Sequence, residues 1–390
     1  MSNLPPEMIA AILCRLPAKE LVFFRCVSKP WCSLIDAPNF IRLHLRHSLQ
    51  TSSNLNLILK NSTAYSVSFD SLEAPKELDH PLMCYNHCIK VLGSCNGLLC
   101  ISNVVNDVAL WNPSTRKHLV LPSLPFELKR YYGTCTCRVY VYGFGYDSIH
   151  DDYKVVRIAQ FVGADPKAFE SEVKVYSLRQ KSWKRIKDMP YFILYPGMNG
   201  VFANGALHWV VSENFDSNIA NIVVSLNLAT LDYSEVLQPE PVGTNFDINL
   251  GVLSDCLCLM ANFRREHTDV WVMNKYSVKE PWTKLFSVAQ HEVVGILRYL
   301  KPLAYSKSGN EVLVVQDDRE LFCYDIKHKQ VKNVPICGAP LIFEVEIFVE
   351  SLVPPHVSRT SNVNMDYENE EQKDGKKRDD FLSEGFKLIL

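Results

Sequence analysis

Residues 90–122 read KVLGSCNGLLCISNVVNDVALWNPSTRKHLVLP, and this stretch decides the fold. It contains four short runs of apolar residues, which are separated by turn residues such as Asn96-Gly97 and Asn112-Pro113. Runs of this length between turn residues are typical of β-strands. The stretch therefore predicts a unit of four short strands.

The four-strand unit recurs along the β-rich part of the chain. The third run of each copy carries a landmark residue, at a spacing of roughly 50 residues. These landmarks are Trp111, Tyr176, Leu226, Met273 and Tyr324. A four-stranded unit that repeats at this period is the sequence sign of a β-propeller. A large β-sandwich, or two smaller β domains, is the alternative fold.

Strand-like runs also remain at both ends of the repeat region. LNLILKN and YSVSFDS precede the first full unit, and FEVEIFVESLV follows the last one. Because none of these runs is a complete unit, we expect them to combine into one composite blade that closes the ring. The sequence thus predicts about six four-stranded blades.

The first 47 residues have helical rather than strand periodicity. Pro5 and Pro6 suit a first helical turn, where the missing proline N–H is not needed, and Pro17 ends that helix. Apolar residues recur there at helical spacing: Met8, Ile9, Ile12, Leu13 and Leu16. So short a segment cannot bury all of its large apolar side chains, which indicates that one face is made for a partner.

Together these patterns predict an α+β multidomain protein. Residues 1–47 are expected to form a small all-α module, and residues 48–355 a large all-β, propeller-like domain. Residues 356–390 combine a charged stretch with the apolar end FLSEGFKLIL. The charged stretch has too few apolar residues to offset its ordering entropy, so we expect the tail to be disordered.

Composition restricts the class of partner. The 390 residues carry a formal net charge of −2, so a strongly basic nucleic-acid binder is not the expected class. No run of ~18 apolar residues is found, and no membrane span is expected. The 13 cysteines are an odd number and follow no export signal, which favours free thiols in a reducing compartment. We therefore expect a cytoplasmic and/or nuclear protein with protein partners.

The helical segment resembles an F-box. Residues 4–35 read LPPEMIAAILCRLPAKELVFFRCVSKPWCSLI, with a leucine-proline start, a Leu16-Pro17 break and Trp31 in a later helix. The β region resembles the plant F-box-associated domain of type 1, a kelch-like propeller. The motifs that carry this resemblance are GSCNGLLCI from Gly93, LWNPSTRKHLVLP from Leu110, YGFGYDSIHDDYKVV from Tyr142, KSWKRI from Lys181 and FANGALHWVV from Phe202.

The resemblance implies a substrate-recognition subunit of an SCF-type (Skp–cullin–F-box) ubiquitin ligase. In this family the F-box binds a Skp-type adaptor, which hangs from the cullin, and the β domain binds the protein to be ubiquitinated and degraded. The subunit itself does no bond chemistry, so neither an enzyme nor a cofactor is expected. The residues implied at the adaptor surface are Leu4, Pro5, Ile9, Ile12, Leu13, Leu16, Pro17, Leu21, Val27 and Trp31.

Strand parity predicts which propeller face binds the substrate protein. Connections between first and second strands, and between third and fourth strands, share one face and are mostly short. The opposite face carries longer connections, such as AQFVGADPKAFESE and DMPYFILYPGMNG. Long loops on a rigid scaffold are the expected recognition surface, and aromatic and arginine side chains are enriched at binding hot spots. These candidates are Tyr131, Tyr132, Phe161, Tyr191, Phe192, Tyr195, Phe215, Arg264, Arg265 and Arg298; packing on the rim is the alternative for each.

Other motifs give weaker indications of chemistry. The group His80, Cys84, His87, Cys88, Cys95 and Cys100 has loose spacing for zinc, and buried free cysteine is the usual alternative. Asp147, Asp151 and Asp152 lack the spacing of a calcium loop, which favours a solvated hairpin turn. His208 beside Trp209 is typical of a satisfied core histidine. We therefore expect no metal site.

Two other functions remain open from the sequence. A propeller enzyme or carbohydrate-binding propeller would need metal ligands or paired acids at the channel mouth, and the repeats show none at equivalent positions. A Skp-binding protein acting outside a ligase would share the F-box but not the cullin.

Overall fold

The structure is a computed structural model that describes residues 4–72, 75–82, 89–104, 106–125, 137–162, 169–193, 198–213, 222–239, 246–264, 266–274, 276, 282–293, 295–338, 340 and 343–356. All of these residues belong to one compact unit. The tail predicted to be disordered lies outside the described residues, apart from its first residue, His356.

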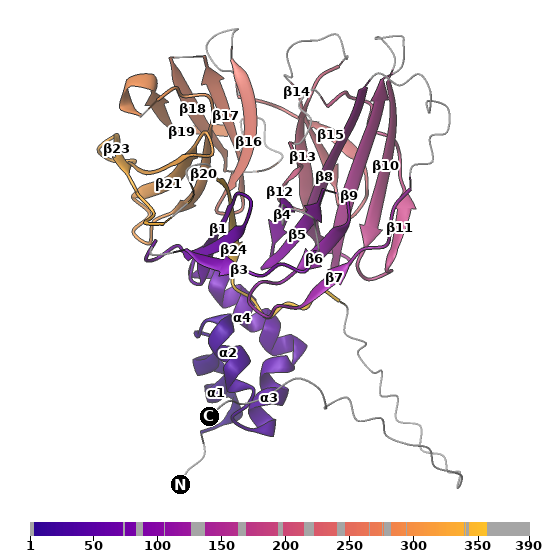
Figure 1. The fold of residues 1–390 in the computed structure, drawn as a ribbon, viewed down its shortest axis with the longest axis vertical. Helices are drawn as coiled ribbons and strands as arrows, with labels where there is room; N and C mark the ends of the chain where they lie inside the picture. The colour runs from indigo at the N-terminus through magenta and orange to yellow at the C-terminus, as the bar shows by residue number, and fades with distance from the viewer. Residues whose placement is uncertain are drawn as a thin grey trace. The chain divides into compact units, whose positions relative to one another are not determined.

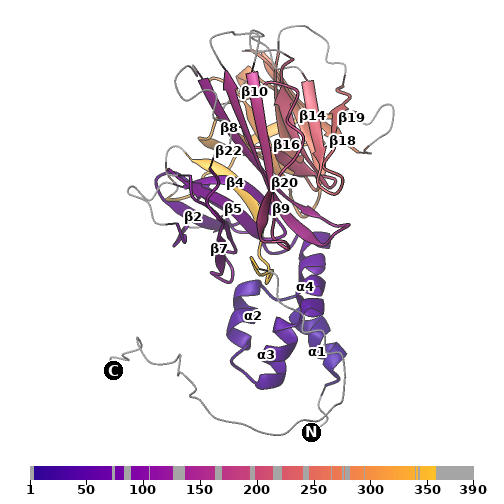
Figure 2. The same ribbon diagram turned by 90° about the vertical axis from the view of Figure 1, so that its right-hand side faces the viewer.

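Four helices open the chain: α1 (Pro6–Leu13), α2 (Ala18–Phe24), α3 (Lys29–Asp36) and α4 (Pro38–Gln50). Proline stands at the start of α1 and α4, where its missing N–H costs nothing. The Ser28 side chain caps α3 by accepting a hydrogen bond from the Trp31 N–H at 3.3 Å. Figure 2 shows the four helices next to one another.

The helices share a small apolar core. Leu13, Ala18, Leu21 and Ile35 are buried there, and the Phe24 ring meets the Trp31 ring edge-on at a centroid distance of 5.9 Å. The helical module predicted from the spacing of apolar residues is therefore present.

Six four-stranded antiparallel sheets follow, which we call blades 1 to 6. Blade 1 contains β24 (Glu344–Val349), β1 (Leu55–Lys60), β2 (Ala64–Ser68) and β3 (Lys76–Leu78). Blade 2 contains β4 (Ile89–Cys95), β5 (Leu98–Asn103), β6 (Val108–Trp111) and β7 (His118–Val120). Blade 3 contains the long strands β8 (Cys137–Asp147), β9 (Asp152–Val162) and β10 (Phe169–Ser177), with β11 (Ser182–Arg185) at its edge.

The remaining sheets have the same strand order. Blade 4 contains β12 (Val201–Ala203), β13 (Ala206–Val211), β14 (Ile222–Asn227) and β15 (Tyr233–Val236). Blade 5 contains β16 (Asp247–Leu253), β17 (Cys256–Phe263), β18 (His267–Met273) and β19 (Trp282–Ala289), followed by the short 3-10 helix η1 (Gln290–Glu292). Blade 6 contains β20 (Leu300–Tyr305), β21 (Glu311–Gln316), β22 (Glu320–Asp325) and β23 (Gln330–Asn333).

The sheets form a closed ring. The first strands of neighbouring blades contact one another in the order β24, β4, β8, β12, β16, β20 and back to β24. Closure at blade 1 is made by β24, which pairs antiparallel with β1 from Leu55↔Val349 to Lys60↔Glu344. Figure 1 shows yellow β24 beside indigo β1. The predicted propeller of six blades, with one composite blade built from both ends of the domain, is confirmed.

Strand direction gives the ring two faces. The short-turn face carries the connections from first to second and from third to fourth strands, including residues 96–97, 148–151, 204–205 and 254–255. The long-loop face carries all other connections. Asn204 and Gly205 both have positive φ, as do Ser254 and Asp255, which suits tight turns between twisted strands.

Candidate functional site

An exposed apolar surface marks the start of the helical module. The exposed fraction is 56% for Leu4, 52% for Met8, 51% for Ile12, 71% for Phe23 and 60% for Val27. Met8 and Ile12 are four residues apart on α1 and therefore lie on the same side of that helix. We call these five residues the apolar helical surface. Several large apolar side chains in so small a module indicate a binding surface.

The residues predicted to contact an adaptor fall into three groups. Leu4, Pro5, Ile12, Pro17 and Val27 are exposed. Leu13 and Leu21 are buried in the module's own core, and Ile9, Leu16 and Trp31 are half-buried against that core. Met8 and Phe23 are exposed but were absent from the prediction, although the spacing of Met8 from Ile12 could have indicated it. Adaptor contact itself stays a prediction for all of them.

A return segment, Glu350–Val353, holds the helical module on the propeller. Leu352 joins the helical core, and the Lys19 Nζ lies 3.0 Å from the Glu350 Oε1. The Asn112 Nδ2, in the turn after β6, donates to the Ser351 carbonyl at 2.9 Å and to the Val353 carbonyl at 2.8 Å. The helical module is thus fixed to the short-turn face at blade 2.

A tight turn makes room for the return segment. The Ser351 Oγ donates to the Asn96 carbonyl at 2.9 Å, and Gly97 beside it has a φ of +81°. A Cβ on Gly97 would lie 2.2 Å from the Ser351 Oγ, so glycine is required here for space as well as for backbone conformation. Ile41 and Leu45 of α4 pack on the same blade, against a cluster that includes Val353.

A central channel of about 1300 Å³ runs between the first strands of the blades. At the short-turn face Leu49 and Gln50, at the end of α4, contribute to its lining. Its other end opens on the long-loop face, because Asp247 begins β16 and Lys90 stands at the start of β4. The helical module and the open end of the channel therefore lie on opposite faces of the ring.

The channel mouth on the long-loop face is lined by charged residues: Lys60, Lys90, Asp247, Arg264, Arg298, Lys301, Asp318, Glu344 and Glu346. Three of the cations are paired. Lys60 lies 3.1 Å from Glu344, Lys301 lies 2.6 Å from Glu346, and Arg264 lies 3.0 Å from Asp247. Lys90 and Arg298 are exposed, and neither side chain has an ion-pair partner among the described residues.

The aromatic and arginine residues predicted for substrate binding have different positions. Arg264 and Arg298 lie at the channel mouth. Phe161 was expected in a loop but lies in β9, and it is buried, as is Phe192. Tyr191 is half-buried, and its hydroxyl donates to Glu235. The remaining candidates lie outside the described residues: Tyr131, Tyr132, Tyr195, Phe215 and Arg265. Substrate contact stays a prediction for the exposed arginines.

Exposed apolar residues on the long-loop face were not predicted. Val104 follows β5, Met198 precedes β12, Leu237 follows β15 and Ile296 precedes β20, so all four lie in connections of this face. Single apolar residues in loops have no periodic pattern, which is why sequence reasoning does not find them. Their exposure adds apolar area to the long-loop face, and Met198 also lines the channel.

His208 is buried in the channel wall and is hydrogen-bonded on both ring nitrogens. Its Nδ1 lies 3.2 Å from the Val201 carbonyl, and its Nε2 lies 2.8 Å from the Tyr276 hydroxyl. Burial lowers the pKa of His208 to about 4, so the ring is neutral at pH 7. The prediction of a satisfied core histidine is confirmed.

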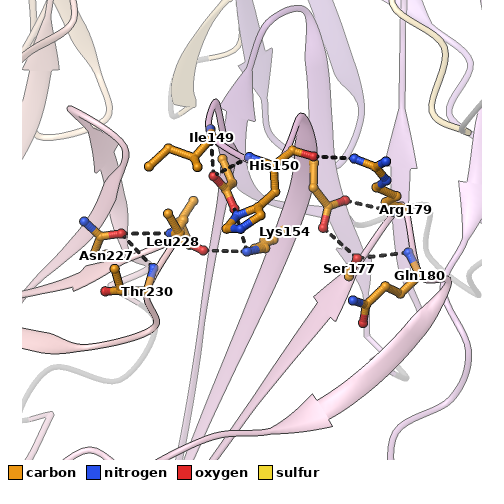
Figure 3. A network of polar contacts seen from close by, with 12 residues as sticks. Ile149, His150, Lys154, Ser177, Arg179, Gln180, Asn227, Leu228 and Thr230 are labelled. Carbon is orange, nitrogen blue, oxygen red and sulfur yellow. Dashed lines mark hydrogen bonds and ion pairs between the residues drawn. The ribbon is translucent and has the colours of Figure 1, made fainter.

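The turn with Asp147 and Asp152 differs from the solvated hairpin expected from the sequence, because both carboxylates are buried. Figure 3 shows the contacts around this turn, among them the dashed line between Lys154 and Leu228. The Asp147 Oδ1 accepts from the N–H groups of Ile149 and His150, at 3.0 and 3.2 Å. Its Oδ2 lies 2.8 Å from the Lys154 Nζ, which also donates to the Leu228 carbonyl in blade 4 at 2.5 Å. The turn therefore connects blades 3 and 4.

The cysteine and histidine group considered for zinc is only partly described. Cys84, His87 and Cys88 lie outside the described residues. Cys95 and Cys100 are buried in blade 2, and burial raises the pKa of both thiols. No group of three or more potential metal ligands occurs in the described part of the chain. Within that part, none of the helices is both long and apolar enough to cross a membrane.

The fold defines the class: a small helical module followed by a six-bladed propeller. Comparison with known proteins supports this division. Residues 1–43 match the F-box domain family, and residues 51–357 match the F-box associated beta propeller domain. The chain therefore belongs to the F-box proteins that carry an F-box-associated propeller.

Curated relatives from Arabidopsis thaliana match over the full length. The chain is 38% identical over 418 residues to F-box protein CPR1, with 100% of both chains covered. It is 35% identical over 413 residues to F-box protein At4g22390, again with 100% of both covered. A solved oligogalacturonate lyase from Vibrio parahaemolyticus has a TM-score of 0.43 at 8% identity, over 74% of this chain and 78% of that chain.

Proposed function

We propose that the chain is the substrate-recognition subunit of an SCF-type ubiquitin ligase. The apolar helical surface binds a Skp-type adaptor and, through it, the cullin. The long-loop face of the propeller binds the protein to be ubiquitinated. The subunit is non-catalytic and acts in the cytoplasm and/or the nucleus, where the ligase meets its substrates. It raises the local concentration of substrate lysines near the conjugating enzyme, which is a proximity effect.

One observation carries this proposal: an F-box with exposed apolar residues is fixed to the face of the propeller opposite the open channel mouth. Leu352 and the Lys19–Glu350 ion pair anchor the F-box to the short-turn face. A protein bound to the long-loop face therefore meets no steric conflict with an adaptor on the F-box. The separation of the two surfaces suits a receptor that holds two proteins at once.

Removing the first two apolar contacts of the F-box tests adaptor binding. Leu4→Ala with Pro5→Ala is expected to lower the recovery of adaptor and cullin about tenfold or more, because apolar anchors dominate such interfaces. Leu4 is exposed, so the fold should not change. The measurement is co-purification of adaptor and cullin with the tagged full chain.

Ile149→Ala is the matched control, since Ile149 is an exposed apolar residue on the propeller. It should leave the recovery of both partners unchanged. Equal recovery with the Leu4/Pro5 variant and the parent would contradict the adaptor assignment. Recovery of adaptor without cullin would instead support a Skp-binding protein that acts outside a ligase.

A proteomic comparison tests the degradation role. Proximity labelling is compared between the parent chain and the Leu4/Pro5 variant, once with the proteasome active and once with it blocked. Substrates should accumulate on the variant when the proteasome is active, because ubiquitination is lost while the long-loop face is intact. Identical partner sets and abundances in both chains with the proteasome active would count against degradation.

A further inference from the structure

We propose that the channel mouth binds an extended acidic peptide segment of the recruited protein, with its acidic side chains at Lys90 and Arg298 and its apolar side chains in the channel. The inference deepens the proposed function and rests on it, because it gives the chemistry of the segment that the receptor would recognise.

The charge of the mouth is the first argument. Glu344, Glu346 and Asp247 neutralise three of its five cations, as described above. The fourth acid, Asp318, accepts a hydrogen bond from the Tyr299 hydroxyl. Asp317, next to it, accepts from the backbone N–H groups of Arg298 and Tyr299. The acids are thus occupied, whereas the side chains of Lys90 and Arg298 have no partner in the described residues.

The positions of Lys90 and Arg298 favour an extended ligand. Lys90 belongs to β4 of blade 2, and Arg298 precedes β20 of blade 6. Blade 1 stands between these blades in the ring, because β24 contacts both β4 and β20. A ligand that reaches both cations must therefore cross the mouth above blade 1. Several carboxylates along one chain segment can do this, whereas a single small anion cannot.

The channel interior is the second argument. Its volume, about 1300 Å³, exceeds the roughly 300–1,000 Å³ that is usual for small-molecule sites. Val91, Val252 and Ile347 contribute half-buried apolar groups to its lining. Apolar side chains next to acidic ones would therefore be accommodated.

One polar side chain in the channel lining has unused hydrogen-bonding capacity. Asn249 of β16 is half-buried in the lining, and its side-chain amide makes no hydrogen bond to the described residues. Peptide groups offer both donors and acceptors to such an amide. Asn249 therefore favours a peptide over a purely apolar ligand.

Peptide display on the full chain tests the inference. A library of random dodecapeptides is selected on the parent protein, and the enriched peptides are then measured on variants. The charge variant is Lys90→Glu with Arg298→Glu. The matched control, Lys117→Glu with Lys332→Glu, makes the same change in net charge at exposed lysines away from the mouth. Asn249→Trp fills the channel without changing its charge.

The enriched peptides are expected to combine Asp or Glu with large apolar residues. The charge variant should weaken their binding about tenfold or more, and the control pair should leave it within about twofold. Asn249→Trp should weaken binding as well. Raising the salt concentration should weaken binding to the parent, because exposed charge pairs are screened.

Three results would each overturn the inference. They are enriched peptides without acidic residues, an equal loss of peptide binding in the charge variant and the control, and a selection that enriches no peptides. Adaptor and cullin recovery is measured on the same variants and should be unchanged. If the parent chain fails to recover adaptor and cullin, the proposed function fails, while the peptide measurement still reports on the channel mouth. The two failures are therefore distinguishable.

Discussion

Asp147 illustrates how one buried carboxylate can join two blades. The Lys154 Nζ is nearly buried and lies between the Asp147 carboxylate and a carbonyl of blade 4. Burial alone would raise the pKa of Asp147, but hydrogen bonds from Lys154 and His150 outweigh it and lower the pKa to about 2. The carboxylate is therefore charged in the folded protein at any physiological pH.

Removing this charge should destabilise the propeller. Asp147→Asn leaves Lys154 buried without its counter-ion, and breaking a buried pair by removing one partner costs about 3 kcal/mol. The free energy of unfolding, measured by urea titration, is expected to fall by that amount. Asp232→Asn is the control, because Asp232 is exposed in a turn on the same face of blade 4. A similar loss in both variants would contradict the role of the pair.

The same carboxylate predicts a pH dependence. In the unfolded chain an aspartate has a pKa of about 3.9, which is above the folded value of about 2. The stabilisation is therefore complete above pH ~4 and is lost as the pH falls toward 2. The difference in unfolding free energy between the parent and Asp147→Asn should shrink over that window. A constant difference between pH 6 and pH 2.5 would refute this explanation.

At the scale of single elements, local patterns explain what could be predicted. The blades were predictable because each copy of the unit carries its own turn residues and apolar runs, such as Asn204-Gly205 before β13. The same logic predicted the pairing of both ends of the domain in blade 1. The apolar residues of α1 were also recognisable from helical spacing, whereas their assignment to an adaptor surface came from the resemblance to an F-box. The split between buried Leu13 and exposed Ile12 required the packed structure.

The return segment could not be predicted in this way. Glu350–Val353 stands at the end of FEVEIFVESLV, the run that the sequence assigns to the last strand, yet β24 ends at Val349. The partner Asn112 lies 239 residues before Ser351, and no local pattern reports contacts at that separation. For the same reason the ion pairs at the channel mouth, which leave Lys90 and Arg298 without an ion-pair partner among the described residues, were not foreseeable. Arg298 itself was predicted only from its residue type.

Asn112 provides the test of the return segment. Asn112→Ala removes the hydrogen bonds that the Asn112 Nδ2 donates to the carbonyls of Ser351 and Val353. Both buried carbonyls then lack this donor. Unsatisfied buried groups cost roughly 1–3 kcal/mol each, so we expect a loss of about 2 kcal/mol or more in the free energy of unfolding. Urea titration measures it.

Asn227 is a matched control for Asn112. Both side-chain oxygens accept hydrogen bonds from the backbone N–H groups two and three residues ahead in their turns. Asn227 lies in the corresponding turn of blade 4, without a return segment on it. Asn227→Ala should therefore cost about 1 kcal/mol or less. Equal losses in the two variants would show that the turn, and not the return segment, explains the effect.

At the scale of the whole molecule, closure makes the ring differ from an open array of repeats. In an open array each repeat contacts only its sequence neighbours, so damage at one end stays local. Here β24 brings residues 344–349 against β1, and Phe348 is buried among Ile58, Leu99 and Trp111 at the boundary of blades 1 and 2. Opening this seam frees both ends of the ring together.

Phe348→Ala is therefore expected to weaken every blade. Truncation of a buried phenylalanine costs about 3 to 5 kcal/mol, and in a closed ring this loss should lower the stability of distant blades by a similar amount. Native-state hydrogen exchange measures the opening free energy of β1 in blade 1 and of β17 in blade 5. Equal losses at both strands are the expected result. Lost protection confined to blades 1 and 2 would show that the blades open independently, because the seam would then not couple them.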